Sequence, residues 1–458
     1  MAKLFATIAS SVLVLTSSFG SHKHPANTLH NLVRRNEGKV AVSSSPAVRQ
    51  SCRHLTQQTS CMSSSFHLEQ STWMFKKYPI AYEVASDVVS GNRDVVPILL
   101  LNGFGVGSFH QHRLMKQLLS QHQSSDANTQ YKIYGIDYLG QGKSWPASCD
   151  DGMSEDEYNL GYSADMWIDQ LTSFIQQVIA PSTGQKVHIV GNSVGGYLGT
   201  ILSYKHPELV ETLTLLNATP VWGLNLPMWD GKLPAPPLPR FVGRALFDTI
   251  RNLDVIDQYL DIAYVYKQAF DGTFDDTFHD EQSDQETKSN ALNLKIRGCT
   301  EGKGGHAAFA SILWSSPAST TDENGNIQTI GFYDGLQQLP IDILLLFGSN
   351  DEWCTPAVAK RMHTTLSKRT ANSDGYTPCQ RYVTIDNAGH CPNHEAPTAV
   401  ARALESWLGA SDRSNASLIT GEKESIHEPW GEVMLREVSI EESENLSFVD
   451  KIVSSMVG

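Results

Sequence analysis

The sequence predicts an α/β fold with a doubly wound, mostly parallel sheet and a helical cap inserted into it. Short apolar runs bounded by turn residues recur along the chain, as is typical of parallel strands buried on both faces. Amphipathic helical patterns separate these runs, and strands alternating with helices favour a parallel sheet. One long segment, residues 221–339, interrupts this alternation and predicts the cap.

The predicted strands follow one another through the middle of the chain. They are Val96–Leu101, Lys132–Asp137, Val187–Val190, Thr212–Leu216, Ile341–Phe347 and Tyr382–Ile385. From Trp167 to Ile179, apolar residues recur at helical spacing, which predicts one amphipathic helix. A similar pattern over Ala399–Leu408 closes the series. The core of the fold is therefore expected in two parts, residues 51–220 and 340–409.

The interrupting segment, residues 221–339, begins with the proline-rich stretch Leu226–Arg240 and includes an acidic loop, Asp275–Glu286. It is rich in aromatic residues, which suit a pocket for a large apolar ligand. The candidate pocket residues are Trp222, Phe309 and Trp314. The alternative for most of these aromatic side chains is that they pack the core of the cap itself.

Composition excludes several classes of protein. The chain has 458 residues, 35 basic and 49 acidic, and its net charge of −14 argues against binding to nucleic-acid phosphates. No apolar run reaches the roughly 20 residues that a bilayer-spanning helix needs. Seven cysteines are an odd and scattered set, expected to be mostly free thiols, although Cys52 and Cys61 could pair.

The two ends are expected to lie outside the fold. Residues 1–20 have a basic start, a short apolar region and small residues, which is typical of a secretory signal peptide. Residues 21–50 are basic and poor in acids, and together the two segments resemble the bipartite plastid address of algae with secondary plastids. The alternative is plain secretion with a propeptide. Residues 410–458 are acid-rich and are predicted to form a disordered tail with at most one weak helix.

The strongest motif is a nucleophile elbow at Gly191-Asn192-Ser193-Val194-Gly195. It lies between a predicted strand and a helical pattern, the context in which G-x-S-x-G presents an exposed serine hydroxyl. We expect Gly191 and Gly195 to avoid collisions at this turn. Ser193 is therefore the candidate nucleophile.

A serine nucleophile needs a base, and the base needs an orienting acid, in the chain order Ser, Asp or Glu, His. Asp351 follows the strand Ile341–Phe347 and His390 follows the last strand, so they are the candidate acid and base. Asp386 lies too close to His390 in the chain to orient its ring, and Asp342 lies at the wrong end of its strand.

An oxyanion hole needs backbone N–H donors, each worth about 3 kcal/mol of barrier. The amide of Val194, directly after the nucleophile, is one expected donor. Phe104 is the other, because it follows Gly103 in the glycine-rich loop after the strand Val96–Leu101.

The chain resembles the α/β-hydrolase fold superfamily from about Trp73 to Leu408. The blocks that carry this resemblance are Asn102–Gly105, Asp137–Ser144, Gly191–Gly196 and Leu216–Pro220. Two further blocks, Gly305–Leu313 and Ala388–Glu395, are similar to pheophytinase, chlorophyll dephytylase and the long chlorophyllases of algae. Asn393-His394 departs from the His-Asp usual at this point in pheophytinase.

This resemblance implies that the enzyme hydrolyses the phytyl ester of chlorophyll or pheophytin, without a metal or organic cofactor; the net charge already argues against a nucleic-acid partner. Peripheral contact of the cap with a thylakoid or plastid membrane would be compatible with it. A general carboxylesterase or lipase, or a C–C bond hydrolase, would keep the same three residues. A non-catalytic ligand receptor on this scaffold is the alternative from another class. Metal-like spacing at His390–His394 is set aside because His390 is already the candidate base.

Overall fold

The computed structural model describes residues 66–87, 93–124, 128–146, 160–222, 229–233, 235–273, 291–301, 305–372 and 375–445. The expected signal peptide, transit-like segment and Cys52–Cys61 pair lie outside these residues, as does the acidic loop Asp275–Glu286.

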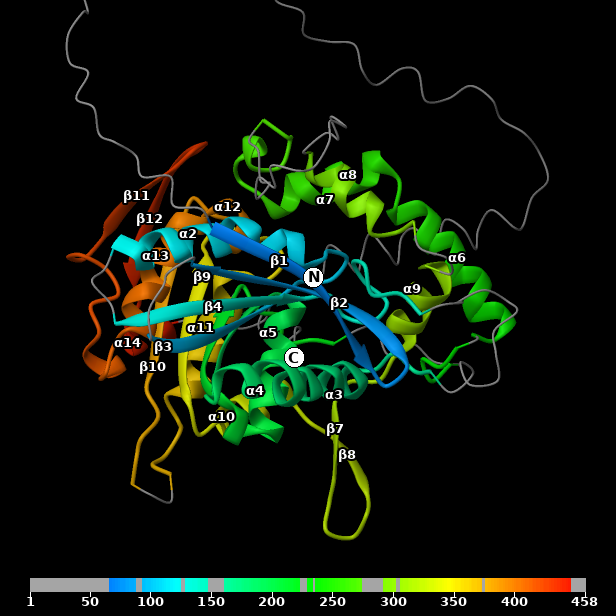
Figure 1. Cartoon of the computed structure of the whole chain (residues 1–458), viewed down its shortest axis with the longest axis horizontal. Coiled ribbons are helices and arrows are strands. Elements are labelled where there is room, and N and C mark those ends of the chain that lie inside the picture. Colours follow the sequence, from blue (N-terminus) through cyan, green and yellow to red (C-terminus); the bar gives the residue numbers. More distant parts are fainter. Residues whose placement is uncertain are drawn as a thin grey trace, which may run out of the picture.

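A ten-stranded sheet forms the centre of the molecule (Figure 1). In spatial order its strands are β1 (Phe66–Phe75), β2 (Tyr78–Asp87), β4 (Thr129–Ile136), β3 (Asp94–Leu101), β5 (Val187–Asn192), β6 (Val210–Leu216), β9 (Asp342–Gly348), β10 (Gln380–Asp386), β12 (Gly431–Glu437) and β11 (Glu424–Glu428). From β4 across to β10 every neighbouring pair is parallel. The six predicted strands fall on these six parallel strands, and the predicted fold class is confirmed.

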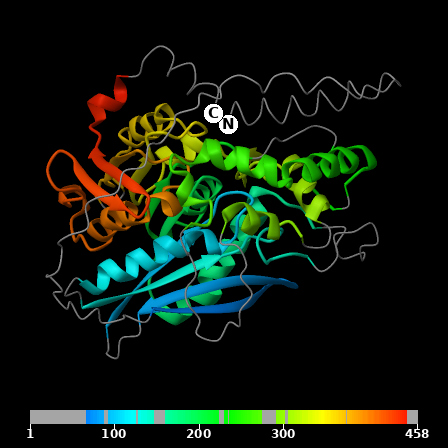
Figure 2. The same ribbon diagram turned by 90° about the horizontal axis from the view of Figure 1, so that it is seen from above.

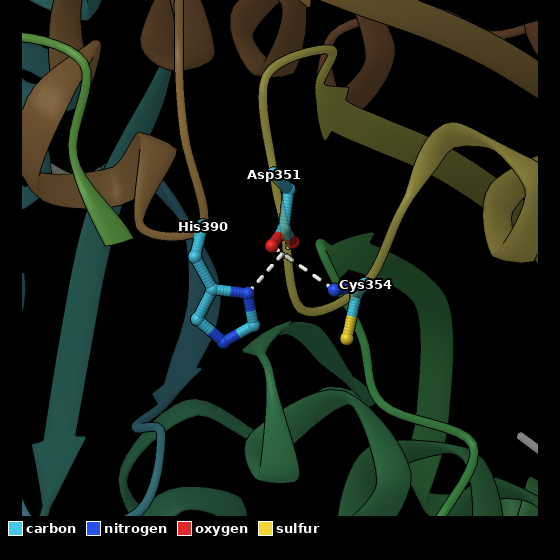
Figure 3. A group of neighbouring side chains, drawn as sticks. All are labelled: Asp351, Cys354 and His390. Carbon is cyan, nitrogen blue, oxygen red and sulfur yellow. Dashed lines mark hydrogen bonds and ion pairs between the residues drawn. The ribbon is translucent and has the colours of Figure 1, made fainter. Parts of the chain in front are cut away.

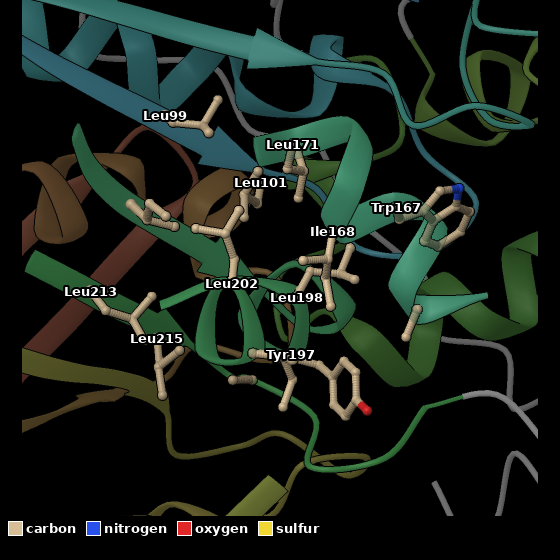
Figure 4. Close-up of a cluster of buried hydrophobic side chains, with 14 of the residues drawn as sticks. Leu99, Leu101, Trp167, Ile168, Leu171, Tyr197, Leu198, Leu202, Leu213 and Leu215 are labelled. Carbon is tan, nitrogen blue, oxygen red and sulfur yellow. The ribbon is translucent and has the colours of Figure 1, made fainter. Parts of the chain in front are cut away.

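Helices cover both faces of the sheet (Figures 1 and 2). They include α2 (His112–Ser124), α3 (Ala164–Phe174), α4 (Ala180–Thr183), α5 (Val194–Lys205), α10 (Phe332–Gln337), α11 (Pro356–Leu366), α12 (Pro392–Glu395) and α13 (Pro397–Leu408). Successive residues of a strand point to opposite faces, so Leu99 and Leu101 pack with α3 and α5, whereas Ile98 and Leu100 pack with α2 and α13. Figure 4 shows the first of these cores. Among the described helices, none has the length and apolarity that a membrane span requires.

The cap consists of α6 (Pro237–Ile250), α7 (Leu253–Ala263), α8 (Leu292–Gly298) and α9 (Gly305–Trp314). In Figure 1 these helices form an arch along one side of the sheet. Helices α6 and α9 approach closely, because a Cβ on Gly243 would lie only 2.3 Å from the Cβ of Ala310. The predicted insertion also contains the hairpin of β7 (Ser319–Thr321) and β8 (Ile327–Thr329), followed by α10, which packs against α5 of the core.

The predicted disordered tail is wrong for residues 410–445. Strands β11 and β12 extend the sheet beyond β10, with Leu435 opposite Ile385, and helix α14 (Ile440–Glu444) follows. Val433 and Leu435 are fully buried and alternate with neighbours that are more exposed. The acids that suggested a solvated tail are partly neutralised by arginines, as in the pair Arg436–Glu442. An alternation this short is hidden by the acidic composition around it.

Replacing Leu435 with Ala should therefore destabilise the whole domain. Removing a fully buried leucine side chain costs about 2–5 kcal/mol of unfolding free energy. Urea unfolding followed by circular dichroism would measure this loss. His427→Ala, at an exposed position of β11, is the matched control and should change stability by less than about 0.5 kcal/mol. Equal stability of Leu435→Ala and wild type would mean that the hairpin does not belong to the folded core.

Candidate active site

Ser193 lies at a sharp turn between β5 and α5. Its backbone has φ 54° and ψ −118°, a strained conformation for a residue with a side chain. The flanking glycines make this turn possible: a Cβ on Gly191 would lie 2.5 Å from the carbonyl oxygen of Gly195. A Cβ on Gly195 would lie equally close to the carbonyl oxygen of Leu101. Strand, turn and helix therefore form the elbow that the motif predicts.

Asp351 and His390 meet at the carboxyl ends of two neighbouring parallel strands. Asp351 follows β9 and His390 follows β10, and His390 Nδ1 lies 2.7 Å from Asp351 Oδ2 (Figure 3). Both residues are buried. The other acid considered on this strand, Asp342, lies at the opposite end of β9 and bonds Tyr376 and Arg413 instead.

The Asp351 carboxylate is surrounded by hydrogen-bond donors. Besides His390, it accepts from the Asn217 side chain at 2.8 Å and from the amides of Trp353 and Cys354 at 2.7 and 3.0 Å. Burial on its own would raise the pKa of Asp351, but the charge and hydrogen bond of His390, with these donors, lower it below its ordinary value. Asp351 is therefore held as an anion against the imidazole.

Asn217 was not predicted as a site residue. It follows β6 at φ 41°, and besides bonding Asp351 it accepts from the Gly348 amide at 2.8 Å. The sequence feature that could have indicated it is an asparagine directly after a predicted buried strand, because asparagine tolerates the left-handed backbone conformation better than most residues. Asn217 thus ties the end of β6 to the loop that carries Asp351.

A second buried carboxylate, Glu395 of α12, organises the loop of His390. It accepts from the amide of Gly389 at 2.6 Å, directly before His390, and from the amides of Val265 and Tyr266 after α7. The His390 amide also donates to the carbonyl of Ala263 at 2.7 Å. The end of a cap helix and the loop of the candidate base are thus held as one unit. Glu395 was not predicted as a site residue.

The sulfur of Cys354 lies close enough to Asp351 and His390 to suggest a metal site, with all three ligand atoms within 4.8 Å of one another. Burial raises the pKa of the Cys354 thiol well above its ordinary value, so the thiolate that binds metals is disfavoured. Asp351 Oδ2 and His390 Nδ1, moreover, already hydrogen bond each other. The chemistry of this trio fits a carboxylate–imidazole pair beside a neutral thiol better than a metal site.

The loop expected to supply the oxyanion donor lies against the nucleophile. A Cβ on Gly103 would lie 3.4 Å from the Cβ of Ser193. Asn102 anchors the start of this loop, because its side chain donates a hydrogen bond to the carbonyl of Ile136 at 3.0 Å. Phe104 and Val194 both line the same cavity as Ser193, and their amides stay the predicted oxyanion donors.

Ser193 and His390 line a cavity of about 350 Å³ between the core and the cap. Its walls are mostly apolar, and the cap supplies Phe247, Ile256, Leu260 and Phe309 among others. Trp222 and Phe309 line the cavity as expected. Trp314, however, packs in the core of the cap, where its ring centroid lies 6.0 Å from that of Trp229. It follows Phe309 by five residues on α9, so the two side chains point to different faces of the helix.

Exchange of Glu395 for Gln should change how stability depends on pH. Burial raises the pKa of Glu395 from 4.5 to about 7, although its three backbone donors oppose this. Between these values the native state holds a proton that the unfolded state has released, so wild-type stability falls as pH rises. Glutamine does not titrate. The stability difference, wild type minus Glu395→Gln, should therefore decrease by about 3 kcal/mol between pH 4.5 and pH 7.

Urea unfolding of both proteins at several pH values measures this difference. Glu422→Gln, at an exposed position, is the matched control and should follow the wild-type curve. A difference between wild type and Glu395→Gln that stays constant over this range would contradict the raised pKa.

Comparison with known proteins places the chain in a family. The model of the alpha/beta hydrolase fold matches residues 96–397. Chloroplastic pheophytinase of Arabidopsis thaliana is 27% identical over 357 residues, which cover 72% of this chain but only 64% of the relative. Proline iminopeptidase of Lactobacillus acidophilus is 23% identical, over 73% of this chain and 97% of the relative.

Among solved structures, a probable hydrolytic enzyme from Pseudomonas aeruginosa PAO1 aligns with a TM-score of 0.49 and 17% identity. This alignment covers 76% of this chain and 95% of the other. The family model alone spans well over half of the sequence, from β3 to the start of α13. The chain therefore belongs to the alpha/beta hydrolase fold family.

Proposed function

We propose that this protein is a serine hydrolase that cleaves the phytyl ester of chlorophyll or pheophytin, releasing phytol and the acidic pigment. The observation that carries the proposal is a largely apolar cavity that holds both Ser193 and an imidazole hydrogen-bonded to a buried carboxylate. The similarity to a protein named pheophytinase, at 27% identity, supports the substrate class.

In the proposed reaction Ser193 attacks the ester carbonyl. His390 donates a hydrogen bond from Nδ1–H to Asp351, which holds the imidazole with Nε2 unprotonated and able to take the serine proton. The amides of Phe104 and Val194 stabilise the oxyanion. The intermediate collapses as His390 returns the proton to the phytol oxygen. Water, activated by the same imidazole, then hydrolyses the acyl-enzyme, so no cofactor takes part.

The cavity favours an apolar ester over the substrate of an aminopeptidase. A free α-ammonium group needs an anionic partner when it leaves water. Among the described residues that line the cavity there is no aspartate or glutamate, whereas aromatic and aliphatic side chains dominate. A carboxylesterase or lipase acting on another apolar ester is the alternative within the same chemistry.

We also propose that residues 1–50 direct the chain to a plastid, with the secretory pathway as the alternative. Exposed Leu238 and Phe241 near the start of α6 support peripheral contact of the cap with a membrane surface. Such a contact would bring the cavity close to pigments that partition into lipid.

The first test is product chromatography after incubation of the full chain with chlorophyll a and pheophytin a in parallel. Wild type should release chlorophyllide or pheophorbide, and Ser193→Ala should lower kcat by about 10⁴–10⁶ because the nucleophile is lost. If wild type hydrolyses a simple aryl ester but releases no acidic pigment from either substrate, the protein is a hydrolase and the proposed substrate is wrong. Full activity of Ser193→Ala would contradict the mechanism.

Asp351→Asn should lower kcat by about 10⁴, because an amide at this position favours the wrong imidazole tautomer. Asp386→Asn is the matched control, since Asp386 ends β10 only a few residues before His390. It should keep kcat within about twofold of wild type. A larger loss in Asp386→Asn than in Asp351→Asn, measured on any hydrolysed ester, would reverse the assignment of the orienting acid.

A further inference from the structure

The apolar cavity contains one arginine whose charge the reaction does not use. Arg251 directly follows α6 and lines the cavity beside Phe247 and Ile250. Its backbone is fixed, because its amide donates to the carbonyl of Phe247 at 3.0 Å and its carbonyl accepts from the Arg297 guanidinium. The base of the side chain therefore has a defined position in the cavity wall.

The guanidinium of Arg251 has an unused hydrogen-bond donor. Its Nε is buried and has no hydrogen-bond partner within the described part of the chain. Its Cζ lies 5.3 Å from the centroid of the Phe247 ring, within the range of a cation–π contact. The described lining residues include no carboxylate that could pair with it. An arginine in an apolar cavity wall without a counter-charge is costly, so an oxygen acceptor on the bound substrate would stabilise its guanidinium.

A row of aromatic contacts leads from the reacting centre to this arginine. Phe104, in the loop against Ser193, lies 5.9 Å from Phe309 between ring centroids. Phe309 lies 5.5 Å from Phe247, on which the Arg251 guanidinium rests. Arg251 is therefore separated from the nucleophile by a wall of rings, against which a flat, extended ligand can lie.

We propose that Arg251 is a specificity-determining residue that donates a hydrogen bond to a carbonyl oxygen on the macrocycle, remote from the ester that is cleaved. The proposal rests on the function proposed above. A chlorophyll-type macrocycle carries a ketone and a second ester carbonyl besides its phytyl ester, so it offers acceptors away from the reacting carbon. A simple phytyl ester offers none, and Arg251 selects between the two classes of substrate.

The test compares two esters that share the phytyl leaving group, pheophytin a and phytyl acetate. Arg251→Met, which removes the charged donor but keeps a long apolar side chain, should lower kcat/KM for pheophytin a by roughly 10- to 100-fold, the range expected for one hydrogen bond to a charged group. The same variant should hydrolyse phytyl acetate within about twofold of wild type, which also reports on its folding. Arg244→Met, an exposed arginine on α6, is the matched control and should leave both rates unchanged.

The possible outcomes separate this inference from the proposed function. If wild type hydrolyses pheophytin a and Arg251→Met does so equally well, only the inference is overturned. An equal loss on both esters would also overturn it, because the arginine would then act on the phytyl chain or on the fold. If wild type hydrolyses phytyl acetate but neither pheophytin a nor chlorophyll a, the proposed function fails, and the inference fails with it.

Discussion

The contact between Asp351 and His390 is the interaction on which the rest of the site depends. A carboxylate buried this deeply is costly unless every lone pair has a partner. Asn217 and two backbone amides supply those partners, so the ends of β6 and β9 must keep their register for the charge to be tolerated. The sheet therefore does more than carry these residues: its parallel order makes a buried anion possible at this edge.

The cap and the hairpin formed by β11 and β12 are both hydrogen-bonded to the segment around His390. Glu395 joins the loop of His390 to the end of α7, and Trp430 of the hairpin donates to the carbonyl of Glu395 at 2.8 Å. Tyr266, just after α7, donates to the carbonyl of Glu432 in β12. Segments far apart in the sequence thus meet around one imidazole. Movement of the cap at this point would move the loop of His390 as well.

The sequence allowed the elbow and the central strands to be predicted because their signals are local. The glycines around Ser193 and continuous apolar runs such as Val96–Leu101 can be recognised in the sequence without knowledge of tertiary contacts. Asn217 and Glu395 could not be found in this way, because each acts through backbone groups brought close only by folding. Strand β12 was missed since only Val433 and Leu435 mark its buried face within an acidic segment.

Substrate choice must come from the cap rather than from the core. The chain is similar both to a pheophytinase and to a proline iminopeptidase, so the shared scaffold does not distinguish an apolar ester from a peptide. What distinguishes them is the chemistry of the walls around Ser193. A cavity lined by rings and aliphatic side chains gains from burying a large apolar ligand, and it offers an ammonium group no counter-charge among its described residues. Arg251 is the one arginine among the described lining residues, which include no lysine, and its charge favours an oxygen acceptor over a cation. On the proposed function, the same core can serve different hydrolases, while the cap of this one selects apolar substrates that carry oxygen acceptors.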